Sequence, residues 1–237
     1  MSIDAPALVL LPGMHGTGAL FQPFVSELDG FDVRICGYPA DEPLGYAELE
    51  KIVRRMLPTE GLFAVLGESF SGPIAVSLAA APPPGLVGVV LSCTFVRNPR
   101  PELAALGGLI DILPVDRAPA ALLDFLLLGA FSTPTLRAAL AAAIHKVSRG
   151  TLRARLKAVL SVDMSEALAA SKLPVLYLHA TRDRIVPARA LDDVRHALAT
   201  VEVASIDGPH LLLQTRPEEA AAAVREFCLG SETHATP

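Results

Sequence analysis

The stretch AVLGESFSGPIA, residues 64–75, places two serines directly after an apolar run. A serine on a tight turn between a strand and a helix can act as a nucleophile, and such a turn needs small residues because it brings backbone segments close together. Ser69 has Gly67 two positions before it and the small Ser71 two positions after it, whereas Ser71 would have Ser69 and Pro73. We expect Ser69 to be the nucleophile, although Ser71 interrupts the usual pattern G-x-S-x-G. The alternative is a serine-rich N-cap of the next helix.

A nucleophilic serine needs a base, and the base needs an acid that orients it. In the architecture that carries such a turn, the order along the chain is serine, acid, histidine, each just past a strand end. Asp183 follows the apolar run 175–179, and His210 follows the run 201–205. Order and placement therefore predict Ser69 as nucleophile, Asp183 as acid and His210 as base.

Other residues compete for the roles of acid and base. Asp207 is the second candidate for the acid, but it lies three residues before His210 and does not follow the preceding strand. His15 follows the first apolar run, so we expect it, with Ser71, to be a possible substrate contact. Four histidines do not follow the last predicted strand and are expected to be structural or solvated: His145, His179, His196 and His234.

A third requirement is a pair of backbone N–H groups that stabilise an oxyanion. One donor follows the nucleophile and is Phe70; the other should lie in the loop LPGMHGTG, residues 11–18, where Met14 follows the Pro-Gly turn. The glycines of this loop have the order G-x-x-G-x-G, which is not the dinucleotide pattern, and no Gly-Lys-Ser/Thr follows them. The sequence therefore argues against nucleotide binding.

Short apolar runs alternate with longer helical patterns along the chain. Continuously apolar runs indicate strands covered on both faces, and their alternation with helices predicts an α/β fold with a mostly parallel sheet. The predicted strands are 7–11, 32–36, 62–66, 87–91, 175–179 and 201–205. The predicted helices are 19–29, 44–57, 70–81, 188–199 and 217–228.

One segment interrupts this alternation. Residues 97–162 contain no convincing strand and are rich in Ala and Leu, with several prolines. We expect a helical cap over the carboxyl ends of the strands, where open α/β sheets bind ligands. The predicted organisation is a core of residues 1–96 and 163–237 with a cap at 97–162.

The second half of this cap segment is basic. No acidic residue lies between Asp124 and Asp163, whereas six basic residues do: Arg137, Lys146, Arg149, Arg153, Arg155 and Lys157. Four of these have a spacing close to one helical face if Gly150 does not break the helix, namely Lys146, Arg149, Arg153 and Lys157. They form either a solvated face behind a leucine stripe or a docking face for acyl carrier protein or the phosphates of coenzyme A.

The cap segment also carries more apolar side chains than short helices need for internal packing. We expect most of them in the core and the rest to line a pocket for a short or medium acyl group. They are Leu109, Ile110, Leu113, Leu122, Leu123, Phe125, Leu126, Leu127, Leu128 and Phe131.

Composition excludes several other classes of protein. A chain with 51% hydrophobic and 19% charged residues is expected to fold, and a net charge of −5 does not favour nucleic acid. Three dispersed cysteines without a CxxC pair indicate small core residues, and no cluster has metal-ligand spacing, so neither metal nor cofactor is expected. Neither a signal peptide nor a membrane span is predicted, which favours a cytoplasmic location.

The motifs LPGMHGTG, GESFSG, HATRDRIVP and DGPH together resemble the α/β-hydrolase superfamily across nearly the whole chain. They look most like small bacterial hydrolases with the motifs L-P-G-x-D-G-T-G and G-E-S-F-S-G-P. Two residues depart from that pattern, Ser71 in place of glycine and His15 in place of aspartate. The resemblance implies about six strands, without the first strands of the full fold, and the same triad and oxyanion donors.

These features predict a serine hydrolase that cleaves carboxylic esters or thioesters of apolar acyl groups through an acyl-enzyme. An acyltransferase or a carrier-protein or coenzyme A thioesterase would use the same triad. A non-catalytic ligand-binding protein of this fold is the third alternative. The fold alone does not decide among them.

Overall fold

Six strands form one sheet in the computed structural model, which describes residues 6–110 and 118–230. The strands are β1 (Ala7–Leu11), β2 (Val33–Ile35), β3 (Phe63–Glu68), β4 (Leu86–Ser92), β5 (Val175–Ala180) and β6 (Glu202–Ile206). Their spatial order is β2-β1-β3-β4-β5-β6, and all five neighbouring pairs are parallel. The carboxyl ends of all six strands therefore lie at one edge.

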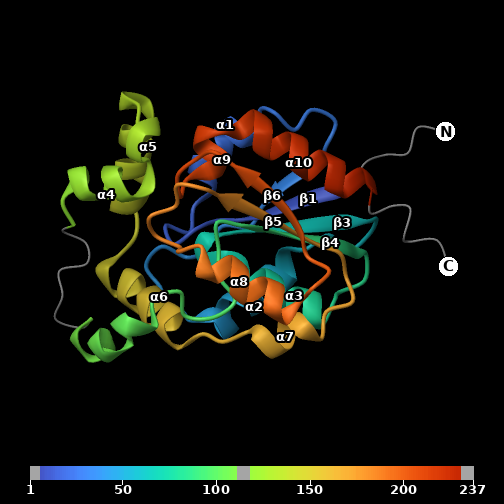
Figure 1. Cartoon of the computed structure of the whole chain (residues 1–237), viewed down its shortest axis with the longest axis horizontal. Helices are drawn as coiled ribbons and strands as arrows, with labels where there is room; N and C mark the ends of the chain where they lie inside the picture. The colour runs from blue at the N-terminus through green and yellow to red at the C-terminus, as the bar shows by residue number, and fades with distance from the viewer. Residues whose placement is uncertain (1–5, 111–117, 231–237) are drawn as a thin grey trace.

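Helices cover both faces of this sheet (Figure 1). One face is covered by α1 (Gln22–Val25), α9 (Leu212–Thr215) and α10 (Pro217–Gly230). The other is covered by α2 (Tyr46–Met56), α3 (Gly72–Ala80), α7 (Ser165–Ala169) and α8 (Arg189–Ala197). Short 3₁₀ helices, η1 (Gly18–Phe21) and η2 (Ser69–Ser71), precede α1 and α3.

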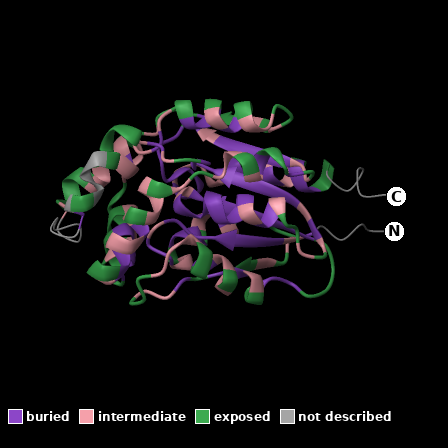
Figure 2. Ribbon diagram, turned by 90° about the horizontal axis from the view of Figure 1, so that it is seen from below, coloured by how far each residue is buried: buried purple, intermediate pink, exposed green. Residues whose placement is uncertain are grey.

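The sheet separates two apolar cores, because successive side chains of a strand point to opposite faces. In β1, Leu8 and Leu10 pack in the core beneath α1, α9 and α10, whereas Val9 and Leu11 pack in the core beneath α2 and α3. Figure 2 shows the buried strands between helices whose outer sides are exposed. Burial on both faces explains why these strands are continuous apolar runs in the sequence.

Five predicted helices are present, but the one expected at 19–29 is shorter. It is realised as η1 followed by the four-residue α1, which ends before Ser26. The Ser26 hydroxyl donates to the carbonyl of Pro23 (2.7 Å), and Gly30 then turns the chain with a φ of 88°. A side chain that bonds local backbone competes with helix continuation, which the apolar pattern alone does not reveal.

The segment 97–162 between β4 and β5, here called the helical segment, consists of helices in the part that the structure describes. They are η3 (Pro101–Leu109), α4 (Ala120–Leu127), η5 (Gly129–Phe131), α5 (Pro134–His145) and α6 (Arg149–Ser161). An antiparallel bridge between Arg97 and Asp163 joins its two ends. Helices α4 and α5 lie beyond the end of the sheet to which β5 and β6 point (Figure 1). Whether this segment forms a separate cap domain stays a prediction.

Candidate active site

Ser69 lies on the tight turn between β3 and α3. Its φ is 50°, a left-handed conformation that costs a non-glycine residue about 1–3 kcal/mol. Glycines on either side make the turn possible, because a Cβ on Gly67 would lie 2.8 Å from the Ser71 carbonyl oxygen and one on Gly72 would lie 2.0 Å from Thr94 Oγ1. A glycine would adopt this conformation with little strain, but it would lack the hydroxyl group of Ser69.

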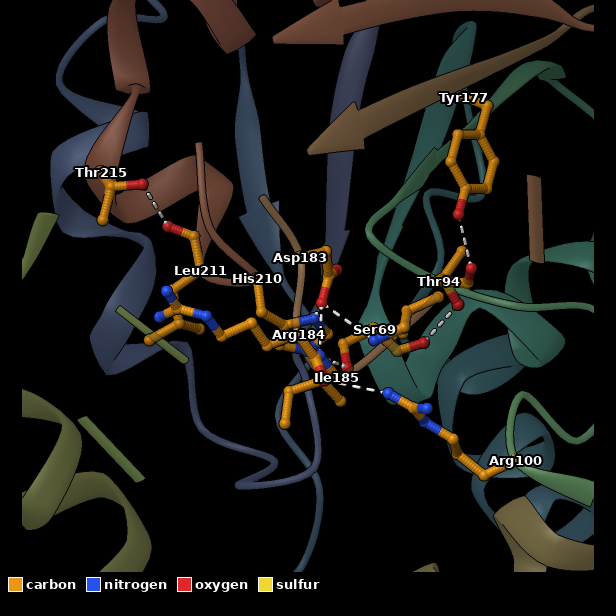
Figure 3. A network of polar contacts seen from close by, with 11 residues as sticks. Ser69, Thr94, Arg100, Tyr177, Asp183, Arg184, Ile185, His210, Leu211 and Thr215 are labelled. Atoms are coloured by element: carbon orange, nitrogen blue, oxygen red, sulfur yellow. Dashed lines mark hydrogen bonds and ion pairs between the residues drawn. The ribbon is translucent and has the colours of Figure 1, made fainter. Parts of the chain in front are cut away.

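A polar network below the turn holds Ser69 in this conformation. The Thr94 hydroxyl donates to the carbonyl of Ser69, and the Tyr177 hydroxyl donates to the carbonyl of Thr94 (2.6 Å). Figure 3 shows this network beside the side chains of Asp183 and His210. The loop after β4 and strand β5 thus fix the turn that follows β3.

Ser69, His210 and Asp183 form one hydrogen-bonded chain. Ser69 Oγ lies 2.8 Å from His210 Nε2, and His210 Nδ1 lies 2.8 Å from Asp183 Oδ2. The other carboxylate oxygen, Oδ1, accepts from the backbone N–H groups of Ile185 (2.8 Å) and Val186 (2.9 Å). Both Asp183 oxygens are therefore occupied, and the carboxylate is fixed toward the imidazole (Figure 3).

The charge state of His210 is set by opposing effects. Burial disfavours the charged imidazole, but the charge and hydrogen bond of Asp183, with the charge of Glu68, outweigh it and raise the pKa of His210 above its usual value. Because the Asp183 carboxylate can only accept, the Nδ1 proton faces it. The lone pair of Nε2 then faces the Ser69 hydroxyl, as a general base requires.

The competing residues lie elsewhere. Asp207 is exposed and pairs with Arg182 (2.6 and 2.8 Å), so it does not serve His210. His145 and His196 are exposed, and His179 is partly buried beside Tyr177. His234 lies outside the described residues.

Ser71 is not placed as expected. It is fully buried and lines neither cavity beside Ser69. Its hydroxyl donates to the carbonyl of Pro12, so the hydroxyl of Tyr38, 2.5 Å away, donates to Ser71. In this structure the serine bonds the neighbouring loop, and a substrate contact of Ser71 stays a prediction.

His15 lies in the loop after β1, and 8% of its surface is exposed. The backbone N–H of Thr17 donates to His15 Nδ1 (3.2 Å), so the ring proton resides on Nε2. Burial and the charge of Arg155 lower the pKa of His15 to about 4, which keeps the ring neutral near pH 7. The side chain lines a cavity at Ser69, and a substrate contact stays a prediction.

Two cavities open at Ser69 and share Met14, Leu156 and Ile185. The first, of about 320 Å³, includes His15 and His210, and the second, of about 300 Å³, includes Phe70. The apolar residues that line the first are Leu123, Leu127, Leu140, Ile144, Leu152 and Leu211; those that line the second are Phe95, Leu103, Ile110, Val159 and Leu160. A larger surface hollow of about 970 Å³ beside α8 is lined by Arg97, Asp163 and other residues and contains none of the predicted site residues.

The apolar residues expected in the helical segment divide among several environments. Ile110, Leu123 and Leu127 line the cavities, Leu128 is buried in a core, and Leu122 and Phe125 are exposed. Leu126 and Phe131 are partly buried. Leu113 lies outside the described residues, as does the side chain of Leu109.

The predicted basic face differs in two respects. Lys146 ends α5, and α6 begins only after Ser148, whose hydroxyl accepts from the N–H of Thr151 (3.1 Å), so the break lies before Gly150 and separates Lys146 from the other three. Arg155, one of the six basic residues of the segment, is fully buried. Arg149 and Lys157 are exposed and Arg153 is partly buried on α6.

The roles of three buried residues at the site were not predicted from the sequence. Glu68 accepts from the N–H of Gly13 (3.2 Å) and from Gln214 Nε2 (2.9 Å), and burial raises its pKa. Tyr38 supports Ser71, and Arg155 reaches the loop after β1. Arg155 lies three positions after Leu152 and directly before Leu156, so its place on the apolar face of α6 was a usable signal.

The described residues include no group of three or more His, Cys, Asp and Glu side chains arranged to hold a metal ion. The three cysteines are buried and free, as small core residues would be. Among the helices described, none has the length and apolar character of a membrane span.

Comparison with known proteins identifies the fold. None of the protein-family models compared matches this chain. The chain is 26% identical over 219 residues to RutD of Escherichia coli O127:H6, which is provisionally assigned as a carbamate hydrolase. The aligned residues cover 82% of this chain and 80% of RutD. It is also similar to an enol-lactonase from Burkholderia xenovorans LB400, with a TM-score of 0.82, 19% identity, and 95% and 92% of the two chains covered.

A third similar structure comes from work on carboxylesterases of the thaumarchaeon Nitrososphaera gargenis, with a TM-score of 0.81, 15% identity, and 98% and 92% of the two chains covered. Together with the parallel six-stranded sheet, these matches show an α/β-hydrolase fold. The predicted fold class is confirmed. At such low identities the structural matches show the fold alone.

Proposed function

We propose that this protein is a serine hydrolase that cleaves carboxylic esters of apolar acyl groups through an acyl-enzyme. The observation that carries the proposal is the chain from Ser69 through His210 to Asp183 at the junction of two mostly apolar cavities. The hydrolases among the similar proteins agree with this choice but do not name a substrate.

Acylation begins at the Ser69 hydroxyl. Its oxygen attacks the ester carbonyl carbon while His210 Nε2 takes its proton, and the carbonyl π electrons move onto the oxygen. Asp183 stabilises the imidazolium that forms, which is the electrostatic effect that raises the pKa of His210. The developing oxyanion accepts hydrogen bonds from the backbone N–H groups of Met14 and Phe70.

The tetrahedral intermediate then collapses and the bond to the alcohol oxygen breaks. His210 returns its proton to the leaving alcohol, and Ser69 carries the acyl group. In the second half, His210 takes a proton from water, the hydroxide attacks the acyl carbonyl, and the proton returns to Ser69 as the acid leaves.

The two cavities suggest the form of the substrate. Because both meet at Ser69 and both have mostly apolar walls, they accommodate apolar groups on the two sides of the scissile bond. Volumes of about 320 and 300 Å³ favour short or medium groups over long chains. An ester with an acyl chain and an alcohol of moderate size fits this arrangement.

The deciding experiment combines covalent labelling with turnover. A fluorophosphonate should label wild-type protein at Ser69, located by mass spectrometry, and should not label Ser69→Ala. Hydrolysis should be measured on esters of graded chain length, matched thioesters of coenzyme A or carrier protein, and matched carbamates. Ser69→Ala should lower kcat by about 10⁴-fold or more on whichever class is cleaved.

The experiment also has a result that contradicts the proposal. Retention of wild-type turnover by correctly folded Ser69→Ala, checked by circular dichroism, would remove Ser69 from the mechanism. Carbamates cleaved at least as fast as esters would redirect the substrate class while leaving the triad in place.

A further inference from the structure

The loop that carries Met14 is held at three consecutive residues by buried side chains. The Ser71 hydroxyl donates to the carbonyl of Pro12, Glu68 accepts from the N–H of Gly13, and Arg155 Nη1 donates to the carbonyl of Met14 (2.7 Å). Ser71 and Glu68 flank the nucleophile on β3 and η2. Arg155 comes from α6 in the helical segment, 141 residues away along the chain.

These contacts define the orientation of the peptide that bears the Met14 N–H. The carbonyl of that peptide belongs to Gly13 and accepts from the N–H of Gly16 (2.9 Å). In a planar trans peptide the N–H points opposite to the carbonyl, so the Met14 N–H is directed away from the Gly16 turn. The peptide before it is held by Ser71 and Glu68, and the peptide after it is held by Arg155.

Arg155 is built into this place by its surroundings. The side chain is fully buried, and Nη2 donates to the carbonyl of Pro39 (2.8 Å) while Nη1 donates to the carbonyl of Met14. Its guanidinium carbon lies 6.0 Å from the ring centre of Phe70, whose own N–H is the second oxyanion donor. Gly16, with a φ of 71°, leaves the room required, because a Cβ there would lie 2.6 Å from Arg155 Nη1.

Burial of the charged Arg155 side chain lowers the stability of the fold. Its printed hydrogen bonds go to the backbone carbonyls of Met14 and Pro39, and among the described residues its Nε has no hydrogen-bond partner. Burial of a guanidinium whose hydrogen-bond partners are neutral carbonyls costs more stability than burial of a well-packed apolar side chain of similar size. A role in packing alone therefore does not explain an arginine at this position.

The electrostatic effect of Arg155 extends to the cavity at Ser69. Its charge is one of the two causes of the lowered pKa of His15, a residue that lines this cavity. A fixed positive charge in a buried site also favours negative charge that develops nearby during a reaction. Arg155 thus combines control of the loop geometry with a favourable field.

We propose that Arg155 is a positioning residue for the oxyanion hole, which links the docking of α6 to the orientation of the Met14 N–H. This inference rests on the proposed function. The helical segment then contributes to catalysis through the loop after β1, in addition to lining the cavities.

The test compares Arg155→Met, Arg155→Lys and the control Arg137→Met with the wild type. Arg137 lies in the same segment, is half exposed and pairs loosely with Asp124 (3.7 Å). We expect Arg155→Met to lower kcat roughly 10–100-fold with KM within about threefold, because an oxyanion donor acts mainly in the transition state. Arg155→Lys keeps the charge but has a single donor nitrogen and should recover part of the loss, whereas Arg137→Met should resemble the wild type.

A pair of inhibitors separates positioning from a loss of folded protein. A trifluoromethyl ketone forms an oxyanion adduct with the serine, and the matching methyl ketone does not form a stable one. A smaller folded fraction weakens both alike, so the ratio of their affinities reports the oxyanion hole. We expect this ratio to fall about tenfold in Arg155→Met.

The outcomes are distinct. An active wild type with an unchanged ketone ratio in Arg155→Met overturns this inference and leaves the proposed function standing. A rise in KM with kcat unchanged overturns it as well. A wild type that neither turns over any ester nor reacts with a fluorophosphonate overturns the proposed function, and this inference with it.

Discussion

The proposed triad and the loop proposed to carry an oxyanion donor are positioned by two different kinds of structure. Ser69, Asp183 and His210 each follow a strand of one parallel sheet, so backbone hydrogen bonds of the core place them together. The loop around Met14 depends on buried side chains from β3, η2 and α6. The first arrangement is carried by the regular architecture, and the second by individual contacts that single substitutions can remove.

The strongest test of the first arrangement is Asp183→Asn. Oδ1 of Asp183 accepts from the N–H groups of Ile185 and Val186, so the asparagine oxygen must stay there and its NH₂ must face His210. Nδ1 would then have to accept, which moves the ring proton to Nε2, opposite Ser69. We expect kcat to fall about 10³–10⁴-fold with little change in Tm.

The measurement is steady-state hydrolysis of the best ester, with Asp207→Asn as the control. Asp207 is exposed and contacts Arg182 instead of His210, so its substitution should alter kcat little. A larger loss from Asp207→Asn than from Asp183→Asn would contradict the assignment of the acid.

Glu68 belongs to both arrangements, because it holds the Gly13 N–H and acts electrostatically on His210. Its negative charge contributes to the raised pKa of His210, and only the neutral imidazole can accept the proton of Ser69. Activity should therefore fall as the pH drops through that raised pKa. Glu68→Gln removes the charge and should move this acid limb to lower pH.

The pH dependence of kcat/KM measures this effect, with the exposed Glu102→Gln as control. If Glu68 acted only through its contact with Gly13, Glu68→Gln would lower the maximum of kcat/KM. The acid limb of the pH profile would then stay where it is in the wild type. A limb that moves to higher pH in Glu68→Gln would contradict the sign derived for the Glu68 charge.

The contrast between the two arrangements also explains what the sequence could predict. Continuously apolar strands and the residues after them are local patterns, so the sheet, Ser69, Asp183 and His210 could be placed without coordinates. The tight turn at Ser69, by contrast, depends on residues that are distant along the chain. That Gly72 is needed against Thr94, while Ser71 fits and bonds Pro12, is decided by contacts between different strands and loops.

The helical segment is harder to predict from the sequence, because basic residues that look alike there can be either buried or exposed. Arg153, Arg155 and Lys157 look alike in the sequence, yet Arg155 alone among them is fully buried. Spacing alone placed Lys146 on the face of α6, whereas the Ser148 N-cap begins a new helix after it. Helix breaks and the burial of single charges depend on tertiary packing that periodicity does not contain.

The smallest expected effect concerns the outer side of α6, opposite in role to Arg155. Arg149 and Lys157 are exposed there, and a coenzyme A or carrier-protein thioester would bring negative charge to them. If the helical segment also recruits such substrates, the double variant Arg149→Glu, Lys157→Glu should raise KM for these thioesters about 3–10-fold at low salt, and less at high salt. KM for small neutral esters should not change. Equal changes of KM for thioesters and for small esters would contradict a role of Arg149 and Lys157 in substrate recruitment. A rise of KM for thioesters alone would instead indicate two roles for α6: its inner side would orient the Met14 peptide, and its outer side would attract the substrate.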